Sequence, residues 1–403
     1  MKIVDRKKQI VILAGFLASA FAVSAQNYYQ DSGNPETLVS ADYQVSTRKE
    51  IVLPQVNGYN VYKADLHTHT VFSDGQANST FRVNEAWLDG LDIMAVTEHI
   101  EYRSFEDIMV RYTKNYHGGK YEKAVNNRID KKPVEGAEFL VDLNFAVRES
   151  QSAAKNKGLL IIPGSEITRN GTTVGHFNAL FTTDNNLIYD MDPVQAVRNA
   201  KAQGALVMHN HPGWRKTSLE FTETEKVLYE EGLIDGVEVM NFHEFYPGIV
   251  DRARERGLFI AANTDVHAST NHEHGRSGFD RPMTLVFAKE KTLESVREAL
   301  EAKRTLAYGF GAVCGEEQLL KDFFTASVKV TVDRLGTQNV YLTVTNMSSI
   351  TYVLKRGDSN QVKLAPFHSV QFSMPKTRET LDLTVLNMYS SKDAHPVVSL
   401  GWE

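Results

Sequence analysis

Short apolar runs recur along the chain between residues 61 and 262, and longer segments of mixed character separate them. The runs are brief and bounded by polar residues, which is typical of buried strands. The seven runs are Val61–Leu66, Leu91–Val96, Leu159–Ile162, Phe177–Phe181, Ala205–Met208, Val237–Met240 and Leu258–Ala262.

Most of the intervening segments carry apolar residues at three- and four-residue spacing among charged ones, which predicts helices packed by one face. These segments are Thr80–Asp89, Ala137–Lys157, Pro193–Gln203, Thr222–Glu231 and Ile249–Arg256. Repeated alternation of strand and helix predicts a parallel sheet, and at this length a barrel rather than two doubly wound domains.

The pattern changes after residue 303, where apolar and polar residues alternate singly. Val328, Val330 and Val332 show this period of two, and similar alternation follows around residues 340–345 and 381–385. Such alternation predicts half-buried strands, so we expect a small antiparallel β-sandwich at the C-terminal end.

The N-terminus has the pattern of a signal peptide. Basic residues precede the apolar stretch Ile10–Val23, and the small residues Ser24 and Ala25 follow it. An uncleaved anchor is the alternative, but the stretch is shorter than the ~20 residues that span a bilayer as a helix. We therefore expect cleavage after Ala25, no stable membrane insertion afterwards, and a periplasmic or secreted protein.

These patterns divide the chain into four predicted parts. They are a signal peptide (1–25), an N-terminal leader (26–60), a barrel (61–320) and a C-terminal β-sandwich (321–403).

Composition narrows the chemistry. The 403 residues are 42% apolar and 23% charged, enough for a large core, and the net charge of -6 disfavours a protein that coats nucleic acid. Cys314 is the only cysteine, so no disulfide, zinc ribbon or iron-sulfur cluster can form within one chain. Any bound metal must therefore be held by histidine and carboxylate.

Potential metal ligands follow the predicted strands. They are His67 and His69, Glu98 and His99, Glu166, His209 and His211, and Asp265 and His267. In a barrel the carboxyl ends of the strands converge on one face, so residues far apart in sequence would meet in one pocket. A metal site at that face explains all five strand ends together.

The ordered motifs D-L-H-T-H-T-V-F-S-D-G, V-T-E-H, P-G-S-E-I, G-H-F-N and T-D-V-H resemble those of the PHP (polymerase and histidinol phosphatase) family of metal-dependent phosphoesterases. The resemblance covers about Asp65 to Gly309. It implies an α/β fold with a distorted seven-stranded βα (TIM-like) barrel of PHP type. With the signal peptide and β-rich tail, it is closest to the exported PHP phosphodiesterases.

The resemblance also implies three divalent ions and their ligands. His67, His69, Glu166 and Asp265 would bind the first ion, Glu166 would bridge to a second held by His176 and His211, and Asp74, His99 and His267 would bind the third. Zinc, manganese and iron all suit such nitrogen and oxygen ligands. The sequence departs from the family motifs in two places. Glu98 stands where the family's T-D-H motif has the shorter aspartate, and His209-Asn210-His211 offers two histidines where one is expected.

Two ions bridged by a carboxylate can hold a hydroxide between them for in-line attack on phosphorus. Asp265 is the predicted residue that orients this hydroxide and accepts its proton, with Glu166 as the bridge. His209, His243 or His272 could protonate the leaving group; the sequence does not rank them, and His209 stands in the predicted catalytic set.

Two arginines are predicted to bind the substrate phosphate. Arg103 lies in Glu101–Gly136, a candidate lid, and Arg276 follows the last metal motif. The predicted function is metal-dependent hydrolysis of small-molecule phosphate esters outside the cytoplasm, phosphodiesters ahead of monoesters, without a nucleic-acid partner. The alternatives are amidohydrolase-like cleavage of a C–N bond and a non-catalytic metal- or glycan-binding surface protein.

Overall fold

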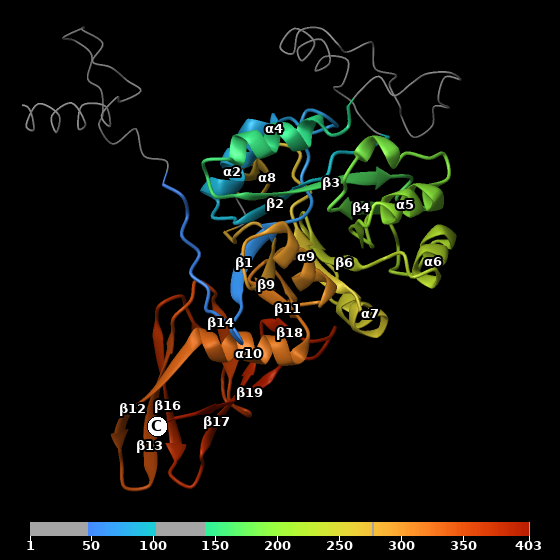
Figure 1. Cartoon of the computed structure of the whole chain (residues 1–403). Coiled ribbons are helices and arrows are strands. Elements are labelled where there is room, and N and C mark those ends of the chain that lie inside the picture. The colour runs from blue at the N-terminus through green and yellow to red at the C-terminus, as the bar shows by residue number, and fades with distance from the viewer. Residues whose placement is uncertain (1–46, 102–141, 276–277, 403) are drawn as a thin grey trace, which may run out of the picture. The chain divides into compact units, whose positions relative to one another are not determined.

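The computed structural model describes residues 47–101, 142–275 and 278–402, and Figure 1 shows their arrangement. Each of the seven expected apolar runs overlaps a strand of one twelve-stranded mixed sheet. Its strands are β1 (Asn60–Asp65), β2 (Ile93–Val96), β3 (Leu160–Thr168), β4 (His176–Leu180), β5 (Leu206–His209), β6 (Gly236–Asn241), β7 (Glu244–Phe245), β8 (Phe259–Asn263), β9 (Met283–Ala288), β10 (Thr305–Gly309), β11 (Ala312–Gly315) and β18 (Met388–Tyr389).

The sheet order is β18-β11-β10-β9-β1-β2-β3-β4-β5-β6-β7, and β8 also pairs with β6. The predicted count of seven strands in a parallel barrel is therefore wrong. β4 runs antiparallel to both β3 and β5. For the β3–β4 pair the reason is the short loop 169–175, which cannot make the long crossover that a parallel pair needs. β9 runs antiparallel to β1 and to β10.

The sheet curls back on itself, since β8 contacts β9 and β10 as well as its partner β6. Each of the five predicted helical segments contains a helix. The helices that accompany this sheet are α2 (Ser79–Leu88), α4 (Phe145–Ala154), the 3-10 helix η2 (Asn185–Leu187), α5 (Pro193–Ala202), α6 (Glu223–Glu230), α7 (Gly248–Arg256), α8 (Thr270–Glu273), α9 (Leu293–Glu301) and α10 (Glu317–Ser327). α2 and α4 lie side by side near β2 and β3, and α4 contacts both of these strands (Figure 1).

Local signals in the sequence set where these helices begin. Asn78 accepts a hydrogen bond from the Phe81 amide at the start of α2, and Thr222 and Glu225 form a capping box at the start of α6. The helices are short, so their positions depend on packing against the sheet more than on intrinsic helix stability.

The tail contains two separate antiparallel sheets. One is β12 (Val328–Leu335), β13 (Asn339–Asn346) and β16 (Ser369–Pro375); the other, in spatial order, is β15 (Val362–Leu364), β14 (Tyr352–Lys355), β17 (Thr380–Val385) and β19 (Val397–Gly401). β13 alternates partly and fully buried residues, as its period of two predicts. Buried residues of both sheets belong to one apolar cluster.

Two elements connect the tail to the main sheet. α10 spans the predicted boundary at residue 320, and β18 pairs in parallel with β11. The domain boundaries stay a prediction, and the signal peptide with most of the leader lies outside the described residues. In the described part of the chain, we find no helix with the length and apolar character needed to cross a bilayer.

Candidate metal centre

The ends of β1 and β8 run beside each other and place three predicted ligands together. Asp265 donates its backbone N–H to the carbonyl of His67 (3.0 Å), and His69 donates to the carbonyl of Val266 (3.2 Å). Thr68 and Val266 form an isolated parallel bridge. Two segments that are far apart in sequence thus meet directly beyond their strands.

The β2, β3 and β4 strands bring the next ligands to the same place. His99 and Glu166 form an isolated parallel bridge, so both side chains leave the sheet at one level. His176 lies opposite Thr168 in the antiparallel pair of β3 and β4, which returns it towards Glu166. Asn210 donates its amide to the carbonyl of His176, which sets His211 beside it.

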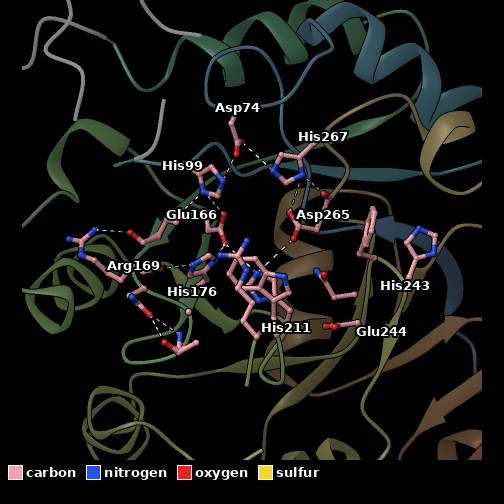
Figure 2. A pocket seen from close by; sticks show the side chains of 18 of the residues that line it. Asp74, His99, Glu166, Arg169, His176, His211, His243, Glu244, Asp265 and His267 are labelled. Carbon is pink, nitrogen blue, oxygen red and sulfur yellow. Dashed lines mark hydrogen bonds and ion pairs between the residues drawn. The ribbon is translucent and has the colours of Figure 1, made fainter. Parts of the chain in front are cut away.

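The predicted ligands gather in three groups, each with its ligand atoms within 4.8 Å of one another. The groups are His67, His69 and Glu166; Glu166, His176 and His211; and His69, Asp74, His99 and His267. Figure 2 shows Asp74, His99 and His267 on one side of Glu166, with His176 and His211 on the other. Glu166 and His69 each belong to two groups.

Glu166 lies between the groups. Its Oε1 is 3.2 Å from His176 Nδ1 and 3.9 Å from His211 Nε2. Its Oε2 is 3.6 Å from His67 Nε2 and 3.5 Å from His69 Nε2. Its Oε2 is also 2.6 Å from His99 Nδ1. One carboxylate therefore faces five imidazoles, the position that we expect of a bridging ligand.

Asp265 lies close to members of all three groups, including His267, whose Nδ1 is 3.8 Å from its Oδ1. Its Oδ1 is 3.1 Å from His67 Nε2 and 3.0 Å from His69 Nε2, and its Oδ2 is 3.8 Å from His211 Nε2. The Asp265 backbone is left-handed (φ 53°), a conformation that a residue other than glycine adopts at a cost in energy. The hydrogen bond from its amide to His67 holds it there.

Asp74 faces the third group from a tight turn. Its Oδ1 is 3.3 Å from His99 Nε2 and 3.2 Å from His267 Nε2. A Cβ at Gly75 would lie 2.8 Å from the backbone of His69, so the turn that presents Asp74 needs glycine.

These side chains fit divalent ions. The Nε2 atoms of His67 and His69 lie 3.1 Å apart, and a shared ion accounts for two imidazole nitrogens aimed at one point. The buried oxygens Asp74 Oδ1 and Glu166 Oε2 accept no hydrogen bond from the described residues and face imidazole nitrogens. Imidazole and carboxylate without thiolate are ligands for zinc, manganese or iron.

Opposite charges inside the cluster shift its pKa values in opposite directions. Burial lowers the pKa of His67, but the surrounding carboxylates, Asp265 first, outweigh it and raise this pKa well above its ordinary value. Burial raises the pKa of Glu166, yet neighbouring imidazoles, His99 first, bring it well below its ordinary range. Burial and a neighbouring imidazole lower the pKa of His211 to about 3, so this ring is neutral, the form that binds metal.

The sequence prediction missed Glu238, a buried carboxylate behind the ligands. Its Oε1 lies 3.0 Å from His67 Nδ1, and its Oε2 accepts the backbone N–H of His211 (2.7 Å). Asn263 and Asn241 donate to the same carboxylate. Because Glu238 engages Nδ1 of His67, Nε2 is left to face the cluster. The sequence feature that could have revealed Glu238 is a charged residue inside the apolar run Val237–Met240.

Arg82, on α2, was also missed. Its fully buried guanidinium donates to the carbonyls of His69 (3.0 Å) and His267 (3.0 Å) and pairs with Glu85 (2.6 Å). It joins the two loops that carry ligands of the third group. The sequence feature that could have revealed Arg82 is its position on the same face of α2 as the buried residues Ser79, Val83 and Ala86.

Glu98, which departs from the family motif, is not in the ligand groups. It accepts hydrogen bonds from the side chains of Thr70 and Ser73, so it braces the loop that presents Asp74.

The structure does not place His209 at the cluster. Its ring lies 2.9 Å from the Tyr229 hydroxyl and 3.1 Å from Glu225, on the α6 side. An extended chain would point His209 and His211 to the same side, but β5 ends at His209 and His211 has a positive φ of 25°. The chain turns between them, and only His211 reaches the other ligands.

A cavity of about 1090 Å³ opens onto the groups. Its lining includes His243. His272 lies in α8, where its backbone N–H donates to the hydroxyl of Ser269, and it is not among the described lining residues. Two arginines, Arg169 and Arg215, line it. The predicted phosphate-binding residues Arg103 and Arg276, with all of the candidate lid except Glu101, lie outside the described residues.

The chain was compared with known proteins. A crystal structure from Bacteroides vulgatus, of a two-domain protein containing a predicted PHP-like metal-dependent phosphoesterase, matches with 31% identity and a TM-score of 0.75. The match covers 88% of this chain and 99% of that one. No protein-family model and no curated protein matches the chain.

The weaker likenesses, on which we base nothing, include two other proteins. A proposed metal-dependent phosphoesterase of Bifidobacterium adolescentis is 17% identical, with a TM-score of 0.33 over 51% of this chain and 88% of that one. A lesion-specific endonuclease of Pyrococcus furiosus is 15% identical, with a TM-score of 0.37 over 64% of this chain and 59% of that one. The Bacteroides vulgatus protein, by contrast, matches along nearly its whole length, and on that match this chain belongs to the family of PHP-like metal-dependent phosphoesterases.

Proposed function

We propose that the chain hydrolyses small-molecule phosphate esters, phosphodiesters ahead of monoesters, with three divalent ions bound at the three ligand groups. The observation that carries this is the position of Glu166 and His69, each shared by two groups at one cavity. Shared ligands place neighbouring ions a few ångströms apart, as hydrolysis at a multinuclear centre requires.

Bound ions would supply an activated water and neutralise the charge of the phosphate oxygens. The residues of the chain have separate tasks. Asp265, with 18% of its side chain exposed, can reach both the ligands and a molecule in the cavity, so it orients the attacking water and accepts its proton. His243 lines the cavity and is the proposed donor of the leaving-group proton.

Two other functions remain as alternatives. An amidohydrolase-like enzyme would cleave C–N bonds with one or two ions, and a surface protein would bind metal or glycan without turnover. The third group, Asp74 with His99 and His267, favours the phosphoesterase, because the other two groups alone would serve a binuclear centre.

Metal content and substrate survey together test the proposal. Purified protein loaded with manganese or zinc is analysed for metal and assayed with bis(p-nitrophenyl) phosphate, p-nitrophenyl phosphate, a panel of amides and a short DNA duplex. We expect more than one ion per chain and the fastest turnover with the diester. DNA belongs in the panel because the exclusion of nucleic acid is itself a prediction.

Different results would favour the alternatives. One ion per chain with cleavage of an amide would indicate the amidohydrolase, and bound metal without turnover of any substrate would indicate the binding protein. Export is part of the same proposal; intact-mass analysis of the mature protein should show Gln26 as its first residue, and a retained Met1 would contradict it.

A further inference from the structure

Arg215 lies in the turn that follows β5 and exposes its side chain at the edge of the cavity. The turn is closed by hydrogen bonds from the Trp214 amide to the His211 carbonyl (2.9 Å) and from the Lys216 amide to the Gly213 carbonyl (3.0 Å). Arg215 itself has a left-handed backbone (φ 55°). The residue therefore has a defined position next to the ligand His211.

Trp214 holds the guanidinium of Arg215 in place. The indole is packed on one side, since a Cβ at Gly171 would lie 2.8 Å from it, and its ring centroid is 5.3 Å from His176 and 5.2 Å from His211. The guanidinium carbon of Arg215 lies 4.2 Å from the indole centroid. This cation–π contact restricts where the guanidinium can lie and uses the face of the indole rather than a hydrogen-bond acceptor, so it does not occupy the N–H donors.

The other cations nearby are already engaged. Arg169 pairs with Glu101 and donates to the carbonyls of Thr168 (3.1 Å) and Asp190 (2.5 Å). Lys216 pairs with Glu225 at 2.5 Å. Within residues 47–101, 142–275 and 278–402, by contrast, Arg215 makes no hydrogen bond or ion pair, and its donors are open to a ligand.

We propose that Arg215 binds the non-bridging oxygens of the substrate phosphate. This inference rests on the proposed function. It assigns phosphate binding to a residue other than Arg103 and Arg276, the two that the sequence predicted. An exposed arginine is common on protein surfaces; Arg215 differs because it is held on Trp214 beside two ligands. Its planar fork of donors matches two phosphate oxygens at once.

A second hollow of about 540 Å³ shares Arg215 and Thr172 with the main cavity. Its lining includes the polar residues Thr217 and Ser218. A phosphate bound at Arg215 can extend one ester substituent into this hollow, so Arg215 contributes more to a diester with a polar substituent than to a monoester.

The test uses the metal-loaded full chain with Arg215→Ala, Arg215→Lys and the matched control Arg334→Ala. Arg334 is also an exposed arginine stacked on an aromatic ring, 4.1 Å from the Tyr341 centroid, but it lies in the tail. We expect Arg215→Ala to raise KM for bis(p-nitrophenyl) phosphate and the Kd of inorganic phosphate by ~10-fold or more, the size of a lost charge-assisted pair. Arg215→Lys should restore part of this, and metal content should not change.

Calorimetric binding of inorganic phosphate separates this proposal from the proposed function, since it needs no turnover. Weaker phosphate binding in Arg215→Ala supports the proposal even if the parental chain hydrolyses no ester. Unchanged KM and Kd in Arg215→Ala would overturn it, as would loss of metal in that variant, because Arg215 would then support the ligands rather than the substrate. A parental chain that neither binds phosphate nor hydrolyses esters would remove both proposals.

Discussion

Glu166 and Asp265 are the two carboxylates on which the proposed chemistry depends most, and their surroundings differ. Glu166 is almost completely buried and faces the imidazoles of both neighbouring groups. Asp265 is partly open to the cavity at the end of β8. Under the proposed function, Glu166 would hold the ions and Asp265 would act on the water that they bind.

This difference predicts distinct phenotypes for two isosteric substitutions. Glu166→Gln should lose metal and activity together, because an amide oxygen carries no net charge to balance two cations. Asp265→Asn should keep part of its metal and lose ~10²-fold or more in turnover, as when a positioned proton acceptor is removed. Metal analysis beside phosphodiester turnover measures both.

The exposed tail residues Glu379 and Asp358 provide matched controls as Glu379→Gln and Asp358→Asn. An Asp265→Asn variant that retains its metals and the parental rate would show that Asp265 is not the proton acceptor, even with the ligand groups intact.

Most predicted ligands that follow an apolar run could be placed from sequence, because the end of a strand fixes their direction. His209 is the exception, since the chain turns between it and His211. Glu238 and Arg82 could not, since their roles depend on which strands and loops become neighbours. In the sequence, each is a charged residue at an apolar position; only the fold shows that His67 or two loop carbonyls satisfy it.

Among the elements, α2 has the clearest link to the candidate site. Arg82→Lys keeps the buried charge opposite Glu85 but cannot donate to both the His69 and the His267 carbonyls in the same geometry. We expect weaker binding of the third ion and a loss of ~10-fold to 100-fold in turnover, the usual effect of removing support behind a ligand.

Metal titration and turnover of the variant measure this effect. Arg297→Lys, in α9, is the control. Arg297 pairs with Glu301 where both side chains are partly exposed, and such an ion pair contributes little to stability compared with a buried one. Parental metal affinity and turnover in Arg82→Lys would mean that the two loops hold their positions without α2.

Strand order was harder to predict than strand existence. β9 is a fully buried apolar run, but it carries no ligand at its end, and nothing in its composition shows that it pairs antiparallel with β1. In the sequence, the connection from β3 to β4 is recognisable only by its shortness, which does not by itself show how β4 pairs with β5. The alternation of strands and helices therefore predicted the sheet and its ligand-bearing edge, but not the mixed directions within it.

At the scale of the whole molecule, the ligand groups join segments from opposite parts of the curled sheet. Ions that bind only the folded chain stabilise it by mass action, by about 2.7 kcal/mol when the free ion is at 100 times its Kd. Removal of metal with EDTA and dialysis should therefore lower the Tm in calorimetry, and added manganese or zinc should restore it. An identical Tm with and without metal would show that the groups hold no ion under those conditions.

The three groups also differ in how much of the chain each one needs. Glu166, His176 and His211 all come from the consecutive strands β3, β4 and β5 and the residue stretch just beyond them, whereas the group around Asp74 needs His267, beyond β8. During synthesis or refolding, we expect the Glu166 group with His176 and His211 to need only the segment from β3 to just beyond β5. The Asp74 group can form only after β8 has packed beside β1 and brought His267 into place. Ion uptake should accordingly follow an order set by the chain itself, and a chain exported unfolded would collect its metals from whatever its destination supplies.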